Sequence, residues 1–353
     1  MDYRVLQKLC NAPGVSGYEA PVAGIIADLI SDYCDGLEYD RAGNLIAFKR
    51  GSHGSCGKRI LCSCHMDEVG FVINHIDECG RLLFEEIGMM TRAYVGKRVL
   101  VGEKRIPGII AVKPVHLLGS DERGKDPDEE KLFIDIGAKS RNEAEKLGVF
   151  ANYAVFDSEY ENFGDKKIKA KALDDRVGCA MLISLLKRGV KYDSYFSFCV
   201  GEELGLRGST PVCERIKPDI CINLECTTAS DIYGVKGAKK VCTLGDGVAV
   251  PFMDNSAVYA PSLYRYVRGL ADELSIPCQT KTAVAGGTDA GAYTKIAGGR
   301  ATIGLAVPTR YIHSAYCVAQ KSDIDACEEL LFELSDRMDV LCSINERRYT
   351  HDR

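Results

Sequence analysis

The sequence predicts an α/β protein with a small β-rich domain inserted into its chain. Apolar residues at helical spacing mark helices that alternate with short apolar strands, and this alternation stops between residues 69 and 162. Within that stretch, β-like runs alternate with Gly and Pro turns. A chain of 353 residues is also longer than one small domain. We therefore expect residues 1–68 and 163–353 to form one discontinuous domain around the insert.

Two helices and two strands are expected before the insert. Residues 2–12 and 18–34 predict the helices, and in the second helix the residues at helical spacing are Val22, Ile25, Ile26, Leu29 and Ile30. Residues 44–49 and 59–64 predict strands, and the second of these ends directly before His65. Residues 70–73, 106–113 and 131–134 predict strands in the insert, with a short helix at 140–147.

The alternation of helices and strands resumes after the insert. The expected elements are a helix at 175–187, a strand at 194–200, a helix at 209–216, a strand at 219–224, a helix at 261–274, a strand leading into 308–313 and a closing helix at 322–341. No internal repeat or low-complexity segment interrupts this order.

The composition excludes several classes of protein. Lys and Arg total 45 against 50 for Asp and Glu, which disfavours a nucleic-acid-binding protein. No run approaches the ~18 consecutive apolar residues of a membrane span, and the N-terminus lacks the pattern of a signal peptide. The sixteen cysteines form no CxxC pair and many lie in apolar runs, which indicates buried, reduced thiols and a cytoplasmic location.

Side chains that suit a pair of divalent metal ions follow the expected strands. His65, the pair Glu202-Glu203 and Glu225 each stand where a strand ends, and the carboxyl ends of strands are where α/β sheets bind ligands. With Asp174 and His313, the chain offers two histidines and three carboxylates as metal ligands. A paired metal site of this kind activates water for hydrolysis.

Two of these motifs indicate roles by their local pattern. In His65-Met66-Asp67 the histidine is a candidate metal ligand, and Asp67 is a candidate partner for its other ring nitrogen. Adjacent carboxylates repel each other unless a cation neutralises them. We therefore expect Glu203 to bind metal and Glu202 to act as general base and acid.

Two readings of the pair Asp174-Asp175 remain open at this point. The pair precedes an expected amphipathic helix, so one carboxylate could cap the backbone N–H groups of its first turn. Alternatively, Asp174 could bridge two metal ions through its two oxygens.

Taken together and in this order, the motifs resemble the TET-type dinuclear-metal aminopeptidases, the glutamyl and leucyl/lysyl aminopeptidases sometimes labelled cellulase or endoglucanase M. The resemblance runs nearly from end to end. It rests on the segments His65–Gly70 (HMDEVG), Asp135–Ser140 (DIGAKS), Ala172–Arg176 (ALDDR), Glu202–Gly208 (EELGLRG), Gly286–Ala290 (GGTDA) and Pro308–Ser314 (PTRYIHS).

This resemblance implies a role for each candidate residue. One ion would be held by His65 and Glu225 and the other by Glu203 and His313, with Asp174 bridging them. Asp67 would orient His65, and a cis peptide bond commonly follows the bridging aspartate. Many relatives have aspartate at the position of Glu225, so the longer side chain here changes the reach of one ligand.

The resemblance also implies the architecture and the assembly. A mixed-sheet, zinc-peptidase-like catalytic domain would carry an inserted β-barrel-like domain, residues 69–162, which serves oligomerisation. Dimers of such chains associate into tetrahedral dodecamers. The ions would be zinc or cobalt, because sites of His and carboxylate bind several divalent metals.

The expected reaction is removal of N-terminal residues from short peptides. A hydroxide that bridges the metals would attack the scissile carbonyl, with Glu202 as the general base and acid. The alternatives are a metal-dependent deacylase or dipeptidase acting on N-acyl amino acids, and a catalytically silent assembly protein on the same fold. A glycosidase is disfavoured because those enzymes usually need two carboxylates and no metal pair. Arg310 and residues 286–290 are candidates for the pocket wall that selects the substrate side chain.

Overall fold

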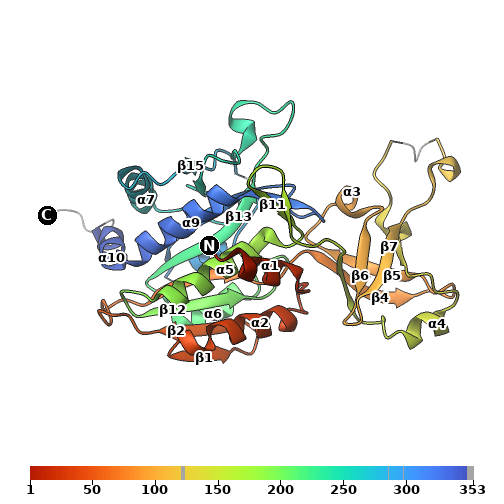
Figure 1. The fold of residues 1–353 in the computed structure, drawn as a ribbon, viewed down its shortest axis with the longest axis horizontal. Helices are drawn as coiled ribbons and strands as arrows, with labels where there is room; N and C mark the ends of the chain where they lie inside the picture. Colours follow the sequence, from red (N-terminus) through yellow and green to blue (C-terminus); the bar gives the residue numbers. More distant parts are fainter. Residues whose placement is uncertain (121–123, 285, 297, 348–353) are drawn as a thin grey trace.

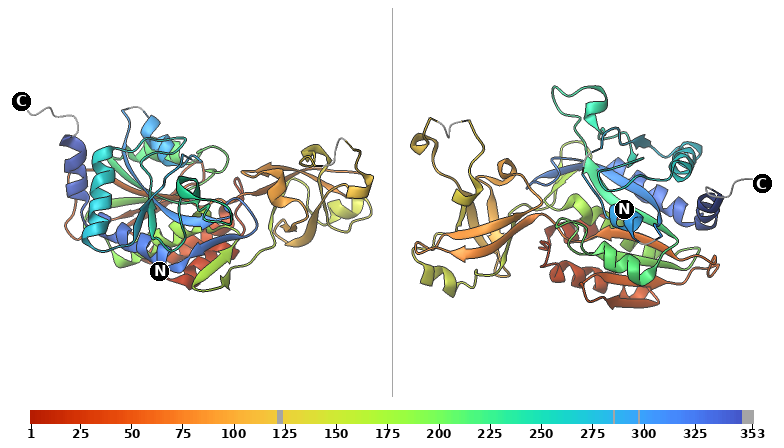
Figure 2. Two further views of the ribbon diagram at one scale, coloured as in Figure 1. Left: turned by 90° about the horizontal axis from the view of Figure 1, so that it is seen from above. Right: turned by 180° about the vertical axis from the view of Figure 1, so that it is seen from behind.

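A computed structural model of the chain shows a mixed α/β domain and a closed β-barrel side by side (Figure 1). The structure describes residues 1–120, 124–284, 286–296 and 298–347. The barrel projects from one side of the larger domain, and the two views of Figure 2 show the same separation.

The larger domain is built on an 11-stranded mixed sheet with the order β1-β2-β12-β3-β13-β16-β17-β11-β10, to which β14 and β15 are attached beside β16. The strands are β1 Gly36–Tyr39, β2 Leu45–Lys49, β3 Ile60–His65, β10 Glu161–Phe163, β11 Lys167–Ala170, β12 Ser194–Cys199, β13 Ile220–Thr228, β14 Val248–Val250, β15 Cys278–Thr280, β16 Ala301–Arg310 and β17 Cys317–Gln320.

The centre of this sheet is parallel, and its strands are apolar on both faces. β12, β3, β13 and β16 run parallel to one another and are buried along almost their whole length. Parallel strands covered by helices on both faces lack the alternation of polar and apolar residues, which explains the continuous apolar runs in the sequence.

Helices cover the two faces unequally. The larger core contains α5 Leu173–Arg188 and α9 Lys321–Ser335, together with α1 Tyr3–Asn11, α2 Ala20–Ile30, α7 Pro261–Glu273 and α10 Met338–Arg347. The smaller core on the opposite face contains α6 Ser209–Ile216 and α8 Ala290–Lys295. Among the described residues, no helix is long and apolar enough to cross a membrane.

The barrel closes in the order β4-β5-β8-β7-β6-β9. Its strands are β4 Gly70–Ile76, β5 Leu82–Ile87, β6 Arg98–Val101, β7 Ile106–Ala111, β8 Phe133–Asp135 and β9 Tyr153–Phe156, with the short helices α3 Thr91–Tyr94 and α4 Arg141–Lys146. Phe71 lies at its centre, and the rings of Phe84, Tyr94 and Phe156 meet it edge to face at 5.0–5.5 Å. Such aromatic pairs contribute about 0.5–1.5 kcal/mol beyond their burial.

The expected closing helix at 322–341 was wrong as a single element. The structure has two helices there, α9 ending at Ser335 and α10 beginning at Met338. The chain turns at Asp336, whose carboxylate forms an ion pair with Arg188 of α5. Beyond the turn, Met338 and Leu341 of α10 lie in the larger core.

Candidate active site

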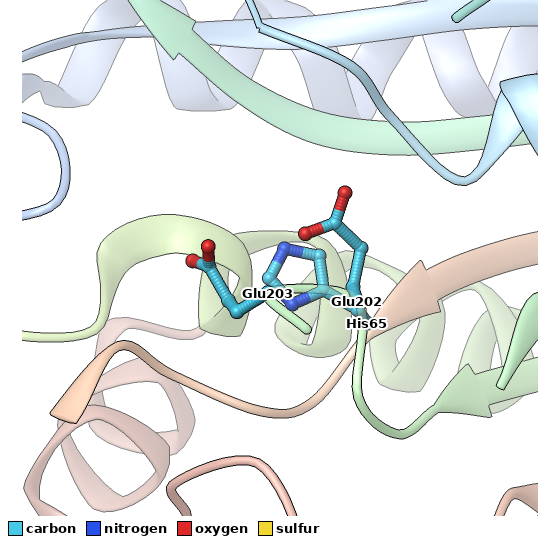
Figure 3. A group of neighbouring side chains, drawn as sticks. All are labelled: His65, Glu202 and Glu203. Atoms are coloured by element: carbon cyan, nitrogen blue, oxygen red, sulfur yellow. The ribbon is translucent and has the colours of Figure 1, made fainter. Parts of the chain in front are cut away.

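The candidate ligands come together at one edge of the sheet. His65 is the last residue of β3, and Glu202 and Glu203 follow β12. Glu225 lies in the carboxyl-terminal half of the parallel strand β13, two residues after Asn223, which pairs with Ser63 of β3. Figure 3 shows the ring of His65 with the carboxylates of Glu202 and Glu203 on either side of it. A ligand atom of each of these three residues lies within 4.8 Å of the other two.

Asp174 lies between the two histidines. Its Oδ1 is 3.4 Å from Nε2 of His65, and its Oδ2 is 3.5 Å from Nε2 of His313. The remaining carboxylates divide between the same two histidines. Glu225 Oε2 lies 3.5 Å from His65 Nε2, and Glu203 Oε2 lies 3.3 Å from His313 Nε2. The structure therefore forms two clusters of three side chains that share Asp174.

The pair Asp174-Asp175 divides the two roles that its sequence left open. Asp175 Oδ1 accepts a hydrogen bond of 3.0 Å from the backbone N–H of Gly178, so Asp175 caps the regular part of α5. Asp174 is turned toward the histidines instead. The peptide bond between the two aspartates is cis, which confirms that expectation.

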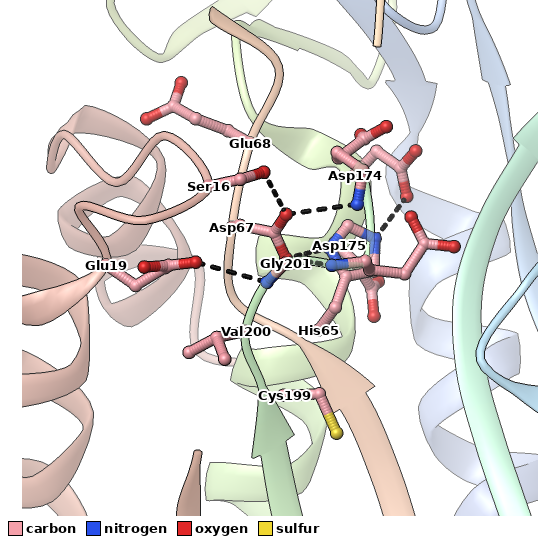
Figure 4. A network of polar contacts seen from close by, with 12 residues as sticks. Ser16, Glu19, His65, Asp67, Glu68, Asp174, Asp175, Cys199, Val200 and Gly201 are labelled. Carbon is pink, nitrogen blue, oxygen red and sulfur yellow. Dashed lines mark hydrogen bonds and ion pairs between the residues drawn. The ribbon is translucent and has the colours of Figure 1, made fainter. Parts of the chain in front are cut away.

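Asp67 connects His65 to the loop of the two glutamates, as Figure 4 shows. Its Oδ1 lies 3.3 Å from His65 Nδ1 and accepts a hydrogen bond of 3.1 Å from the backbone N–H of Glu202. Its Oδ2 accepts from the backbone N–H of Glu203 at 3.1 Å and from Ser16 Oγ at 2.6 Å. Asp67 is fully buried, and these four contacts compensate the charge of its carboxylate.

The electrostatics of the cluster favour a bound cation. Burial, together with neighbouring carboxylates, raises the pKa of Glu202 and of Glu225 well above the usual range, and burial raises that of Glu203 to about 7. Burial opposes a charge on His313, yet Asp174 and Glu203 raise the pKa of its ring to about 9. Buried carboxylates this close repel one another, and positive charge among them relieves the repulsion.

The donor set fits divalent metals of the zinc type. Each cluster offers one imidazole nitrogen and two carboxylate groups, all buried or half-buried, and nitrogen and oxygen donors suit zinc. In one cluster the other ring nitrogen of His65, Nδ1, lies 3.3 Å from Asp67 Oδ1, so Nε2 is the nitrogen that points at the cluster.

A cavity of about 500 Å³ opens beside these side chains. Asp174, Glu202, Glu203, Glu225 and His313 all line it, so a substrate in the cavity would meet the clusters directly. The other lining residues include Gly88 of the barrel domain, Lys281, Ile312 and residues 286–288.

Of the two candidates for the pocket wall, residues 286–288 line this cavity. Arg310 instead forms an ion pair with Asp231, with Nε 2.7 Å from Oδ1. Arg310 is therefore not among the described residues that line this cavity.

Two residues that were not identified from the sequence, Asn223 and Ser16, form hydrogen bonds to Glu225 and Asp67. Asn223 Nδ2 donates to Glu225 Oε1 at 3.0 Å, and the backbone N–H of Asp289 lies 3.3 Å from the same oxygen. Asn223 stands two residues before Glu225 on one strand face, so the period of a strand could have found it. Ser16, which donates a hydrogen bond to Asp67, has no such local signal because it lies 51 residues away from Asp67 in the sequence.

The M42 glutamyl aminopeptidase family model matches residues 43–330. The lysyl aminopeptidase of Pyrococcus furiosus is 31% identical over 337 residues, which cover 92% of this chain and 94% of the relative.

Solved structures share the fold over almost the whole chain. The aminopeptidase APDkam598 of the archaeon Desulfurococcus kamchatkensis superposes with a TM-score of 0.92 at 30% identity, covering 99% of this chain and 98% of its own. The Pyrococcus horikoshii TET1 peptidase and a dodecamer described as PhTET1-12s each give a TM-score of 0.82 at 31% identity, covering 95% of this chain and 99% of theirs. The chain therefore belongs to the M42 glutamyl aminopeptidase family and is a metal-dependent aminopeptidase, a hydrolase of peptide bonds.

Proposed function

We propose that this chain removes N-terminal residues from short peptides with two divalent metal ions held by the clusters that share Asp174. His65, Glu225 and Asp174 would hold one ion, and Glu203, His313 and Asp174 would hold the other. The observation that carries this proposal is that the two oxygens of Asp174 lie 3.4 and 3.5 Å from different histidines. A carboxylate placed in this way suits a bridge between two ions.

Glu202 is the general base and acid of this reaction. Bound metal ions activate water and polarise the scissile carbonyl. Glu202 lines the cavity beside the ligands, where it takes a proton from the attacking water and delivers it to the leaving amine. In the metal-free chain, burial and the neighbouring carboxylates raise the pKa of Glu202.

The closing experiment for this function is hydrolysis of aminoacyl-p-nitroanilides alongside their N-acetylated versions, with Zn²⁺ or Co²⁺ and with EDTA. We expect cleavage of the free-amine substrates only, dependent on metal and abolished by Glu202→Gln. Release of acetate from N-acetyl amino acids, without release of p-nitroaniline from the free-amine substrates, would favour the deacylase. No cleavage of any substrate by metal-loaded protein would favour a silent assembly protein. The preferred side chain in the panel would also identify the specificity.

The same proposal includes the assembly. The Pyrococcus horikoshii TET1 peptidase can form a tetrahedron or a large octahedral shell, and PhTET1-12s is a dodecamer. By likeness, dimers of this chain associate into a tetrahedral dodecamer, with residues 69–162 as the oligomerisation domain and residues 1–68 and 163–353 as the catalytic domain. The boundary after residue 162 is part of the proposal. It falls within β10, Glu161–Phe163, which pairs with β11 in the main sheet.

A cytoplasmic location is proposed on the chemistry of the thiols. No two cysteines are joined by a disulfide in the part of the chain that the structure describes, and twelve of the sixteen are buried. Free thiols persist in a reducing compartment, whereas secreted proteins generally pair them as disulfides.

A further inference from the structure

The loop that carries Glu202 and Glu203 is held by side chains from distant parts of the chain. Four consecutive backbone N–H groups, those of residues 200–203, donate to side-chain oxygens. Asp67 accepts the last two, whereas Glu19 and Asn44 accept the first two. We propose that Glu19 and Asn44 are positioning residues that fix Glu202 and Glu203 for the reaction; this inference rests on the proposed function.

Glu19 reaches this loop from the segment before α2. Its Oε1 accepts a hydrogen bond of 3.1 Å from the backbone N–H of Gly201, 182 residues away in sequence (Figure 4). The side chain is only 7% exposed, and burial raises the pKa of its carboxyl. Burial of a carboxyl group costs free energy unless the group is hydrogen-bonded. The bond from Gly201 therefore favours one orientation of the Glu19 side chain. The backbone φ of Gly201 is +60°, a value that residues with a side chain rarely adopt.

Asn44 holds the same loop at both of its ends. Its Oδ1 accepts from the backbone N–H of Val200 at 2.9 Å, and its Nδ2 donates to the carbonyl of Gly208 at 3.0 Å. A second bond of 2.7 Å from Nδ2 to Asp40 Oδ2 fixes the orientation of the amide. Asn44 is fully buried, and a Cβ on Gly208 would lie 2.3 Å from its Oδ1, so the two residues fit only as a pair.

The loop's internal hydrogen bonds cannot replace these contacts. The N–H groups of Gly205 and Leu206 donate to the carbonyl of Glu202, and that of Arg207 donates to the carbonyl of Gly201. Such bonds fix the shape of the loop, but they move with it. Its place relative to His65 and Asp174 depends on bonds to the rest of the fold, among them those that Asp67, Glu19 and Asn44 accept. A displacement of about 1 Å in a reacting group can reduce the rate a hundredfold.

The test compares Glu19→Ala and Asn44→Ala with the wild type in the metal-loaded, full-length protein. We expect each to lower kcat about tenfold or more at unchanged KM, because the substrate still binds while Glu202 is misplaced. Hydrogen exchange of the backbone amides 200–203 should quicken in both variants. Glu19→Gln retains an oxygen that can accept from Gly201, so it should restore most of kcat and the protection.

Asp323→Ala is the matched control. Asp323 is a fully buried carboxylate that accepts from the N–H groups of Gly245 and Gly247 at 2.8 and 3.0 Å, in a loop that holds no proposed ligand. Its loss should leave kcat within about twofold and exchange at 200–203 unchanged.

Two results would overturn the inference. One is unchanged exchange at 200–203 in both alanine variants, and the other is faster exchange with kcat kept within twofold of the wild type. An inactive wild type would instead overturn the proposed function, while the exchange data would still report whether Glu19 and Asn44 hold the loop.

Discussion

At the scale of single residues, the site concentrates charge that a folded chain without metal must tolerate. The carboxylates of Asp174, Glu203 and Glu225 are buried or nearly so around two histidines. Part of their charge is relieved by protonation, as the raised pKa of Glu203, about 7, indicates. Binding of metal removes this cost, so the affinity for metal and the stability of the fold are linked.

A first prediction concerns this linkage. Zinc at a hundredfold excess over its Kd should raise the free energy of unfolding by about 2.7 kcal/mol per site, because it binds only the folded chain. Thermal unfolding with Zn²⁺ and with EDTA measures the difference. His313→Ala should lose part of the increment, whereas the exposed His53→Ala should keep it. The same melting curve with and without zinc for the wild type would contradict a metal site here.

At the scale of elements, a buried ion cluster joins the segments behind the site. Lys171, which follows β11, places its Nζ 2.5 Å from Glu68 Oε1, and both side chains are almost fully buried. Arg176 of α5 lies 3.5 Å from the same oxygen and donates to the carbonyl of Leu9 in α1. The segment before the barrel domain, the end of β11 and helix α5 are thus tied together close to Asp174.

A second prediction follows from the burial of this cluster. Lys171→Met should lower the free energy of unfolding by about 3–5 kcal/mol, because it leaves the charge of Glu68 buried with less compensation. Arg215→Met removes an ion pair with Glu38 in which both side chains are about half exposed, and it should cost less than about 1 kcal/mol. Chemical denaturation of the metal-free variants measures both. Equal losses in the two variants would count against a role for burial.

At the scale of the whole molecule, the barrel presents apolar side chains to solvent. Val115 and Leu117, just after β7, are 71% and 58% exposed, and Ile109 within that strand is 52% exposed. Large apolar side chains exposed on a surface mark contacts between proteins where they form a patch. They lie in the part of the chain that we propose as the oligomerisation domain.

A third prediction tests the assembly. The full-length protein should have a mass in solution of twelve times the 38.6 kDa chain, measured by light scattering after gel filtration. Val115→Asp with Leu117→Asp should give a smaller species, because charges in an apolar interface lose their solvation. An unchanged mass would remove these two residues from the interface.

Much of the fold could be predicted because its signals are local. The helix expected at 209–216 is α6, and the strand expected at 59–64 is β3 within one residue. Amphipathic helices and apolar strands carry their period within a few residues. The sequence did not predict β1, β5, β6, β9, β10, β11, β14, β15 or β17. All of these except β5 have four residues or fewer, and such short strands exist only through their partners in a sheet.

The chain by itself determined which residue types stand at the ends of the strands, and therefore the chemistry expected of them. His65, Glu203 and Glu225 could be named from the sequence because a polar residue after an apolar strand is a local signal. Only the tertiary structure decided that Asp174 faces both histidines while Asp175 caps a helix. Two adjacent aspartates carry the same local signal, and only the path of the backbone determines which way each side chain points. The tertiary structure also decided that Glu19 meets Gly201, because a contact across 182 residues leaves no trace in local periodicity.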